Sequence, residues 1–220
     1  AHELNQPLTG ILANAQAAQR FLDARPPVLG EIRAILSDII DDDKRAGEVI
    51  QRLREFLRKG KAEVSLLDVN VLVRDVEKLV SSDALIRSVT INLDMIPDTP
   101  TVSADRVQLQ QLVLNLLLNA MEAMTECERE HRRVTVRTRL TDLPAVHVSV
   151  EDAGTGLRPG TEDLVFEPFY TTKPSGMGMG LSTARSIVEA HGGAIWAANN
   201  PSTRGATFHF TVPLTRAKTS

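Results

Sequence analysis

The amino-acid sequence predicts an α+β protein in which a helical hairpin is followed by a two-layer α/β sandwich. Up to about residue 57 the apolar residues recur at alternating spacings of three and four, whereas stretches typical of strands appear only further along the chain. Composition agrees, because 42% of the 220 residues are hydrophobic and only 4% are aromatic, which indicates a core of aliphatic side chains. We therefore expect two domains, residues 1–60 and 61–220.

The first domain carries two apolar stripes at helical spacing, separated by Pro26 and Pro27. These prolines end the first helix because neither can donate a backbone hydrogen bond. A hairpin of two helices leaves apolar surface uncovered, so we expect two chains to pair into a four-helix bundle. Asp43 is expected to take the one inward position of the second stripe without an apolar side chain. The stripes consist of Leu4, Leu8, Ile11, Ala15, Ala18 and Leu22, and of Ile32, Leu36, Ile39, Ala46, Ile50, Leu53 and Leu57.

The second domain is predicted to combine helices with a mostly antiparallel set of strands. A turn at residues 141–144 separates two of these strands, and Gly192 and Gly193 stop the last helix. Elements in this order favour two layers, with helices on the sheet. The helices are expected at about 68–85, 104–126 and 181–190, and the strands at 89–93, 134–140, 146–150, 194–198 and 206–212.

Charge and hydropathy exclude several classes of partner. The chain has 25 Lys+Arg and 28 Asp+Glu, and without a basic run nothing predicts binding of nucleic acid or anionic lipid. Its most apolar stretch, residues 112–124, is shorter than the roughly 20 residues that a membrane span needs.

Cys127 has no second cysteine to pair with, which favours a reducing, cytoplasmic compartment. Since the chain does not begin with Met, we expect it to be a piece of a longer protein.

Two asparagines interrupt the apolar run of the second predicted helix of this domain. Asn115 and Asn119 stand four residues apart, so both carboxamides project from one face. Their oxygens suit a hard cation such as Mg²⁺, which takes oxygen ligands. Alone, such a pair could equally be solvated or capping residues. On so apolar a helix, however, a polar stripe favours a function.

A second stretch, residues 151–156, follows a predicted strand directly. It places the carboxylate of Asp152 at the strand end, where it could accept from an exocyclic amine. Gly154 and Gly156 come next, and glycine is the residue expected where the backbone must approach another group closely. By itself the stretch would be an ordinary turn.

Two more stretches carry features suited to phosphate. Residues 166–173 end in Lys173. This lysine could bind a phosphate as a point charge, or it could simply be solvated. Residues 176–182 lead three glycines into a helix, whose N-terminal amides favour an anion. Their spacing is neither that of a P-loop nor that of a dinucleotide fingerprint, and alone they would indicate a flexible loop.

In this order the four stretches resemble the N, G1, F and G2 boxes of the GHKL nucleotide-binding fold, and residues 205–208 resemble its trailing Gly-x-Thr element. Residues 2–8, HELNQPL, are similar to the H box of two-component sensor histidine kinases. The resemblance covers nearly the whole chain. It implies a GHKL-type ATP-binding domain, a homodimer through the hairpin, an upstream sensor domain in the parent protein, and a response regulator receiver domain as partner.

The same resemblance implies roles for single residues. Asn119, helped by Asn115, would hold Mg²⁺ and the phosphates of ATP, and Asp152 would recognise the adenine amino group. Lys173 and the glycines would enclose the triphosphate, and Thr207 would lie near the base. The other residues assigned to nucleotide binding are Glu122, Gly154, Gly156, Gly176, Gly178, Gly180 and Leu181.

His2 is the expected phosphoacceptor. A neutral imidazole nitrogen would attack the γ-phosphorus of ATP while the other ring nitrogen sheds or shares its proton, for which Glu3 is the base that the resemblance implies. Pro7 removes a backbone hydrogen bond and loosens the helix near His2. Gln6, also assigned to catalysis, occupies the position where many relatives carry Thr or Asn. The other histidines, at positions 131, 147, 191 and 209, are expected to be ordinary surface residues.

A GHKL ATPase gate of the chaperone or mismatch-repair kind is the competing interpretation, because it resembles this chain in the same boxes. Those proteins carry Glu where Asn115 stands. A carboxamide cannot take a proton from water, so this site is better suited to holding ATP until a nucleophile arrives, which favours the kinase. A degenerate, non-enzymatic scaffold is disfavoured because no box is visibly broken.

Overall fold

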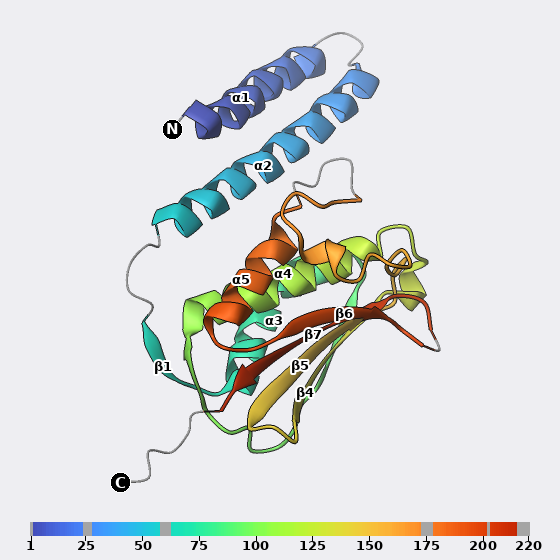
Figure 1. Ribbon diagram of the computed structural model, residues 1–220. Helices are drawn as coiled ribbons and strands as arrows, with labels where there is room; N and C mark the ends of the chain where they lie inside the picture. Colours follow the sequence, from blue (N-terminus) through green and yellow to red (C-terminus); the bar gives the residue numbers. More distant parts are fainter. Residues whose placement is uncertain (1, 24–27, 58–62, 173–177, 202, 215–220) are drawn as a thin grey trace. The chain divides into compact units, whose positions relative to one another are not determined.

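The computed structural model forms two compact units, Ala1–Lys61 and Ala62–Ser220, each of which is described by itself (Figure 1). For residues 2–8 and 44–57 the description is limited to the helical backbone. The residues described are 2–23, 28–57, 63–172, 178–201 and 203–214.

The first unit is the predicted hairpin, with α1 (His2–Asp23) and α2 (Leu29–Leu57) running antiparallel (Figure 1). Ala18 of α1 and Ile32 and Ile35 of α2 are its buried apolar side chains among those described. Large apolar side chains also remain exposed on both helices. They include Leu12, Leu22, Leu29, Leu36 and Ile40.

The inward stripe of α2 differs from the predicted one at two positions, while Ile32 is buried as expected. Ile35 is buried where Leu36 was expected, and Asp43 is exposed. Asp42 takes the inward position instead, since a Cβ built on Gly10 of α1 would collide with its carboxylate. Among the predicted α1 positions, Ala15 and Leu22 are exposed as well. The reason is that several registers satisfy a helical spacing, and only the partner helix selects one of them.

The second unit is a five-stranded mixed sheet covered on one face by helices (Figure 1). Strand order is β2-β4-β5-β7-β6; β2 pairs with β4 in parallel and the other pairs are antiparallel. The strands are β2 (Thr90–Asp94), β4 (Arg133–Leu140), β5 (Ala145–Asp152), β6 (Ile195–Asn199) and β7 (Ala206–Pro213), and the helices are α3 (Val69–Ile86), α4 (Arg106–Ala123) and α5 (Gly180–Ala190).

The core of this unit lies between the sheet and the helices. Alternate residues of β4, β5 and β7 point into it, as Val134, Val148 and Phe210 do, and all three are almost completely buried. Leu112 and Leu116 of α4 are fully buried against them. This helix-on-sheet packing confirms the predicted fold class.

One small sheet was not predicted: β1 (Val64–Leu67) pairs antiparallel with β3 (Val102–Asp105). The prediction instead began a helix at residue 104, whereas α4 begins at Arg106. Asp105 caps it, since its Oδ1 accepts from the amides of Val107 (2.9 Å) and Gln108 (3.1 Å). The predicted end at residue 126 is also too late, because α4 ends at Ala123. Two short 3₁₀ helices, η1 (Arg129–His131) and η2 (Leu164–Phe166), complete the unit.

Within the described residues, every helix is too short or too polar to cross a lipid bilayer.

Candidate functional site

Asp152 ends β5 with its side chain buried, at 3% exposure. Its Oδ1 accepts hydrogen bonds from the amides of Gly154 (2.8 Å) and Ala206 (3.3 Å). These amides come from the loop after β5 and from the first residue of β7. The carboxylate is therefore held in one orientation by backbone on two sides.

The loop after Asp152 packs closely on the protein itself, which is why it contains glycines. A Cβ on Gly154 would lie 2.6 Å from the carbonyl oxygen of Ala123, at the end of α4. Gly156 has a φ of +74°, and a Cβ there would lie 2.8 Å from Oδ1 of Asn199. The amide of Thr155 donates to the Ala123 carbonyl at 3.3 Å. The loop is thus anchored on α4 at one point and on the end of β6 at another.

Asn115 and Asn119 are half-buried on α4, as are Gln108, Gln110 and Gln111. The Nδ2 of Asn115 donates to the carbonyl of Gly180, at the start of α5, at 3.2 Å. Asn119 and Glu122 also make polar interactions. The structure therefore brings the predicted asparagine face together with the end of the glycine-rich segment.

The glycine-rich segment is tied to the aromatic stretch before it. Gly178, with a φ of +66°, accepts from the amide of Phe169 at 3.0 Å, and a Cβ on it would overlap the carbonyl of Tyr170. Phe169 itself has a positive φ of 67° and an exposed ring. Gly180 and Leu181 begin α5, so the predicted helix start is confirmed. Lys173 and Gly176 lie outside the described residues.

Thr207 does not share a face of the sheet with Asp152. It pairs with Glu151 in the register of β5 and β7, and neighbouring residues of a strand point to opposite faces. Its hydroxyl donates to Oδ1 of Asn200 at 2.6 Å. Ala206, not Thr207, is the β7 residue whose amide meets the Asp152 carboxylate.

Asn199 and Asn200, at the end of β6, both bond to the loop that begins at Asp152. Sequence reasoning missed them. The available signal was two consecutive asparagines between a predicted strand and the Gly205 element, but nothing local to that segment says that it returns to residues some 40 positions earlier.

His2, Glu3 and Gln6 lie in the first turns of α1, which begins at His2. The helix continues through Pro7, whose nitrogen cannot donate to the carbonyl one turn before it. The side chains of residues 2–8 are outside the description. The roles of His2, Glu3 and Gln6 therefore stay predictions.

Three of the other histidines are half-buried and bonded within the fold, so the prediction that they are ordinary surface residues is wrong for them. His191 follows α5, and its Nε2 accepts from the amide of Asp105 at 3.0 Å, which links α5 to the start of α4. His147 Nε2 and His209 Nδ1 lie 3.1 Å apart, and both rings stack with Trp196, at centroid distances of 5.4 and 5.0 Å. Burial lowers the pKa of His147. Burial, with a smaller contribution from the charge of His147, lowers the pKa of His209 to about 4.

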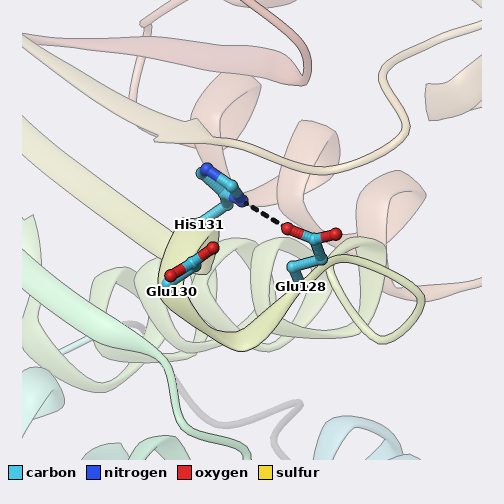
Figure 2. A group of neighbouring side chains, drawn as sticks. All are labelled: Glu128, Glu130 and His131. Atoms are coloured by element: carbon cyan, nitrogen blue, oxygen red, sulfur yellow. Dashed lines mark ion pairs between the residues drawn. The ribbon is translucent and has the colours of Figure 1, made fainter.

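Glu128, Glu130 and His131 gather at η1, with Nδ1 of His131 3.4 Å from Oε2 of Glu128 (Figure 2). All three side chains are exposed. Exposed acidic groups commonly gather without a metal ion, so we assign this cluster no metal.

Two family models match the chain. Residues 104–216 match the model described as "Histidine kinase-, DNA gyrase B-, and HSP90-like ATPase", and residues 1–61 match the "His Kinase A (phospho-acceptor) domain". Among curated proteins, the sensor protein FixL of Bradyrhizobium diazoefficiens is 38% identical over 214 residues, which cover 97% of this chain and 42% of FixL. The sensor histidine kinase TmoS of Ectopseudomonas mendocina is 35% identical over 97% of this chain and 22% of TmoS. The chain thus spans less than half the length of these relatives.

Solved structures of histidine kinases are similar in fold. The nucleotide-free catalytic domain of ThkA is 31% identical with a TM-score of 0.61, and the match covers 69% of this chain and 95% of that one. ThkA in complex with the response regulator protein TrrA is 27% identical with a TM-score of 0.69 over 98% of this chain and 60% of that one.

Proposed function

Because the chain belongs to the histidine kinase-, DNA gyrase B- and HSP90-like ATPase family and is the catalytic core of a two-component histidine kinase, we propose that it transfers the γ-phosphoryl group of ATP to His2. The observation that carries the proposal is the buried Asp152, held by backbone amides at the end of β5 in a unit of the ATPase fold. This family assignment confirms the prediction from the sequence.

Adenine recognition is assigned to Asp152. Its carboxylate is an acceptor only, which matches the exocyclic amine of adenine and opposes the carbonyl that guanine carries at the same place. The amides of Gly154 and Ala206 keep the side chain in position before any nucleotide arrives. Thr207 is left out of this assignment because it lies on the other face of the sheet.

Phosphates and Mg²⁺ are assigned to the region where α4 meets the start of α5. The oxygens of Asn115, Asn119 and Glu122 are hard donors that fit Mg²⁺, which would neutralise phosphate charge when bound. Because the amide nitrogen of Asn115 points to the Gly180 carbonyl, its oxygen is directed away from that carbonyl. The N-terminal amides of α5 favour an anion. Lys173, Gly176, Gly178, Gly180 and Leu181 complete the proposed triphosphate site.

The phosphoryl transfer is a substitution at phosphorus. A neutral ring nitrogen of His2 forms a bond to the γ-phosphorus as the bond to the bridging oxygen breaks and ADP leaves, while the proton of the other nitrogen passes to Glu3 or to solvent. Asn115 suits this outcome because a carboxamide cannot act as the base for water. Gln6, one turn after His2, would lie beside the phosphorylated ring.

We also propose a response regulator receiver domain as the next acceptor, through an aspartate. The likeness to ThkA, whose structure includes the response regulator TrrA, supports this partner. A homodimer would bury the exposed apolar residues of the hairpin, such as Leu36 and Ile40. FixL and TmoS are both named as sensors and are more than twice as long as the matched region, which supports a further sensor domain in the parent protein; we place it upstream of this chain.

Incubation with γ-labelled ATP followed by acid tests the proposed chemistry. A phosphoramidate P–N bond is lost in acid and survives base, whereas a serine phosphoester survives acid. We expect acid-labile label on the protein, which a receiver domain then removes. Acid-stable label, or steady release of phosphate without labelled protein, would instead favour another acceptor or the ATPase gate.

A further inference from the structure

Two consecutive asparagines at the end of β6 hold both ends of the loop at residues 152–157. Asn199 pairs with the backbone of Leu157 twice: its Oδ1 accepts from the Leu157 amide at 2.6 Å, and its Nδ2 donates to the Leu157 carbonyl at 2.9 Å. A neighbouring strand would make the same pair of bonds. The end of the loop is thereby fastened to β6.

Asn200 holds the beginning of the loop. Its Nδ2 donates to the carbonyl of Asp152 at 2.8 Å and to that of Arg204 at 3.1 Å, and its Oδ1 accepts from the hydroxyl of Thr207 at 2.6 Å. Its backbone amide donates to Gly205 at 3.1 Å. One side chain therefore joins the end of β5, the turn before β7 and β7 itself.

Close packing leaves this arrangement little freedom. A Cβ on Gly205, whose φ is +103°, would overlap the carbonyl oxygen of Asp152, the same atom that Asn200 binds. A Cβ on Gly156 would collide with the Asn199 oxygen that binds Leu157. The asparagines and the glycines thus fit together as one unit around the Asp152 carboxylate.

We propose that Asn199 and Asn200 are positioning residues for nucleotide recognition, which act by holding the 152–157 loop in its binding conformation; this inference rests on the proposed ATP site. The pair is assigned no contact with the nucleotide. Without it, the loop must be ordered when the nucleotide binds, and the entropy of ordering is subtracted from affinity. Chemistry at saturating ATP would be unaffected.

Four single variants of the full chain separate the contributions of the two asparagines. Asn199→Ala removes the side-chain hydrogen bonds to Leu157, and Asn200→Ala removes those to Asp152, Arg204 and Thr207. Asn200→Asp keeps the acceptor for Thr207 but can no longer donate to Asp152, and it places a negative charge against that carbonyl. Asn92→Ala is the matched control, because Asn92 is an exposed asparagine of β2.

The measurements are ADP and GDP binding by calorimetry, KM and kcat of self-labelling, and unfolding in urea. We expect the ADP Kd and the ATP KM to rise about tenfold for Asn200→Ala, less for Asn199→Ala, and at least as much for Asn200→Asp as for Asn200→Ala, with kcat within about twofold. The preference for ADP over GDP should shrink as Asp152 loses its orientation. Asn92→Ala should change neither constant.

A double variant tests whether Asn200 acts through Asp152. If it does, Asn200→Ala in a chain that already carries Asp152→Asn should cost far less than about tenfold, because the group it positions is gone. An equal loss of ADP affinity in the unmutated and the Asp152→Asn chain would overturn the proposal. Unchanged ADP affinity in the folded single variants would overturn it as well. Should Asn200→Ala unfold the chain, Asn199→Ala decides by the same criteria. If the unmutated chain bound no adenine nucleotide, the proposed function itself would fail.

Discussion

The two units of the molecule differ in how completely each buries its own apolar side chains. In the sandwich, core residues such as Leu116 and Val148 have no exposed surface. In the hairpin, even the best-buried described residues, Ala18, Ile32 and Ile35, keep 9% exposure, and Leu36 keeps 49%. The sandwich therefore has a core that it buries by itself, whereas the described residues of the hairpin leave apolar surface that the proposed homodimer would cover.

The strongest test of this division concerns the chemistry. We expect His2→Gln to abolish acid-labile labelling, by at least about a hundredfold, because it removes the nucleophile. Its ADP affinity should stay within about twofold of the original, since the nucleotide site belongs to the other unit. Labelling and calorimetry on the same preparation decide both points. Label retained on the variant would show that another residue is the acceptor.

The second test compares stability. Leu116→Ala should lower the free energy of unfolding of the sandwich by about 2–5 kcal/mol, because it leaves a cavity in a packed core. Leu79→Ala, at a residue 70% exposed on α3, should change it by less than about 0.5 kcal/mol. Urea unfolding followed by circular dichroism measures both. Equal effects would mean that the core is not where the structure places it.

The third test concerns Asp152 in the sandwich. Asp152→Asn should weaken ADP binding by about 1.5–3 kcal/mol, the contribution of a hydrogen bond to a charged group. Glu151→Gln is the control, since Glu151 lies on the opposite face and pairs with Arg137. Calorimetry with ADP and GDP provides the measurement. Equal binding of the two nucleotides by the unmutated chain would exclude Asp152 as the base-recognising residue.

The fourth test addresses the exposed face of the hairpin. Leu36→Ser should weaken the homodimer about tenfold, if that side chain is buried between copies. Ser37→Ala, the neighbouring exposed position, should leave the dimer affinity within about twofold. Sedimentation over a range of protein concentrations measures both. Unchanged affinity in Leu36→Ser would place the dimer contact on another face.

The last test concerns the sheet face that carries His147, His209 and Trp196. The folded pKa of His209, about 4, is below its ordinary value of 6.5, so the fold favours the neutral ring. The resulting stability is fully present above pH 6.5 and is lost as pH falls toward 4. Because the ring is half-exposed, we expect a loss on the order of 1–2 kcal/mol. The fluorescence of Trp196, the only tryptophan, follows unfolding and so measures this loss of stability. His209→Gln should make the free energy of unfolding depend less on pH.

Much of the fold could be predicted from the sequence because helices and strands are encoded by local spacing. The prolines at 26 and 27 separated the hairpin helices, and the predicted spans for α3, α5, β4 and β5 differ from the observed ones by at most a few residues. The motifs around Asn115, Asp152 and Gly180 identified the family for the same reason, since each is a short, contiguous pattern.

Tertiary structure alone decided which residues face one another. The position of Asp42 rather than Asp43 depends on how α1 packs on α2, and the pairing of β1 with β3 joins segments nearly forty residues apart. Thr207 lies away from Asp152 because the register of β5 and β7 places it there. Asn199 and Asn200 reach residues 42 and 48 positions earlier in the chain, and such long-range contacts leave no trace in local periodicity.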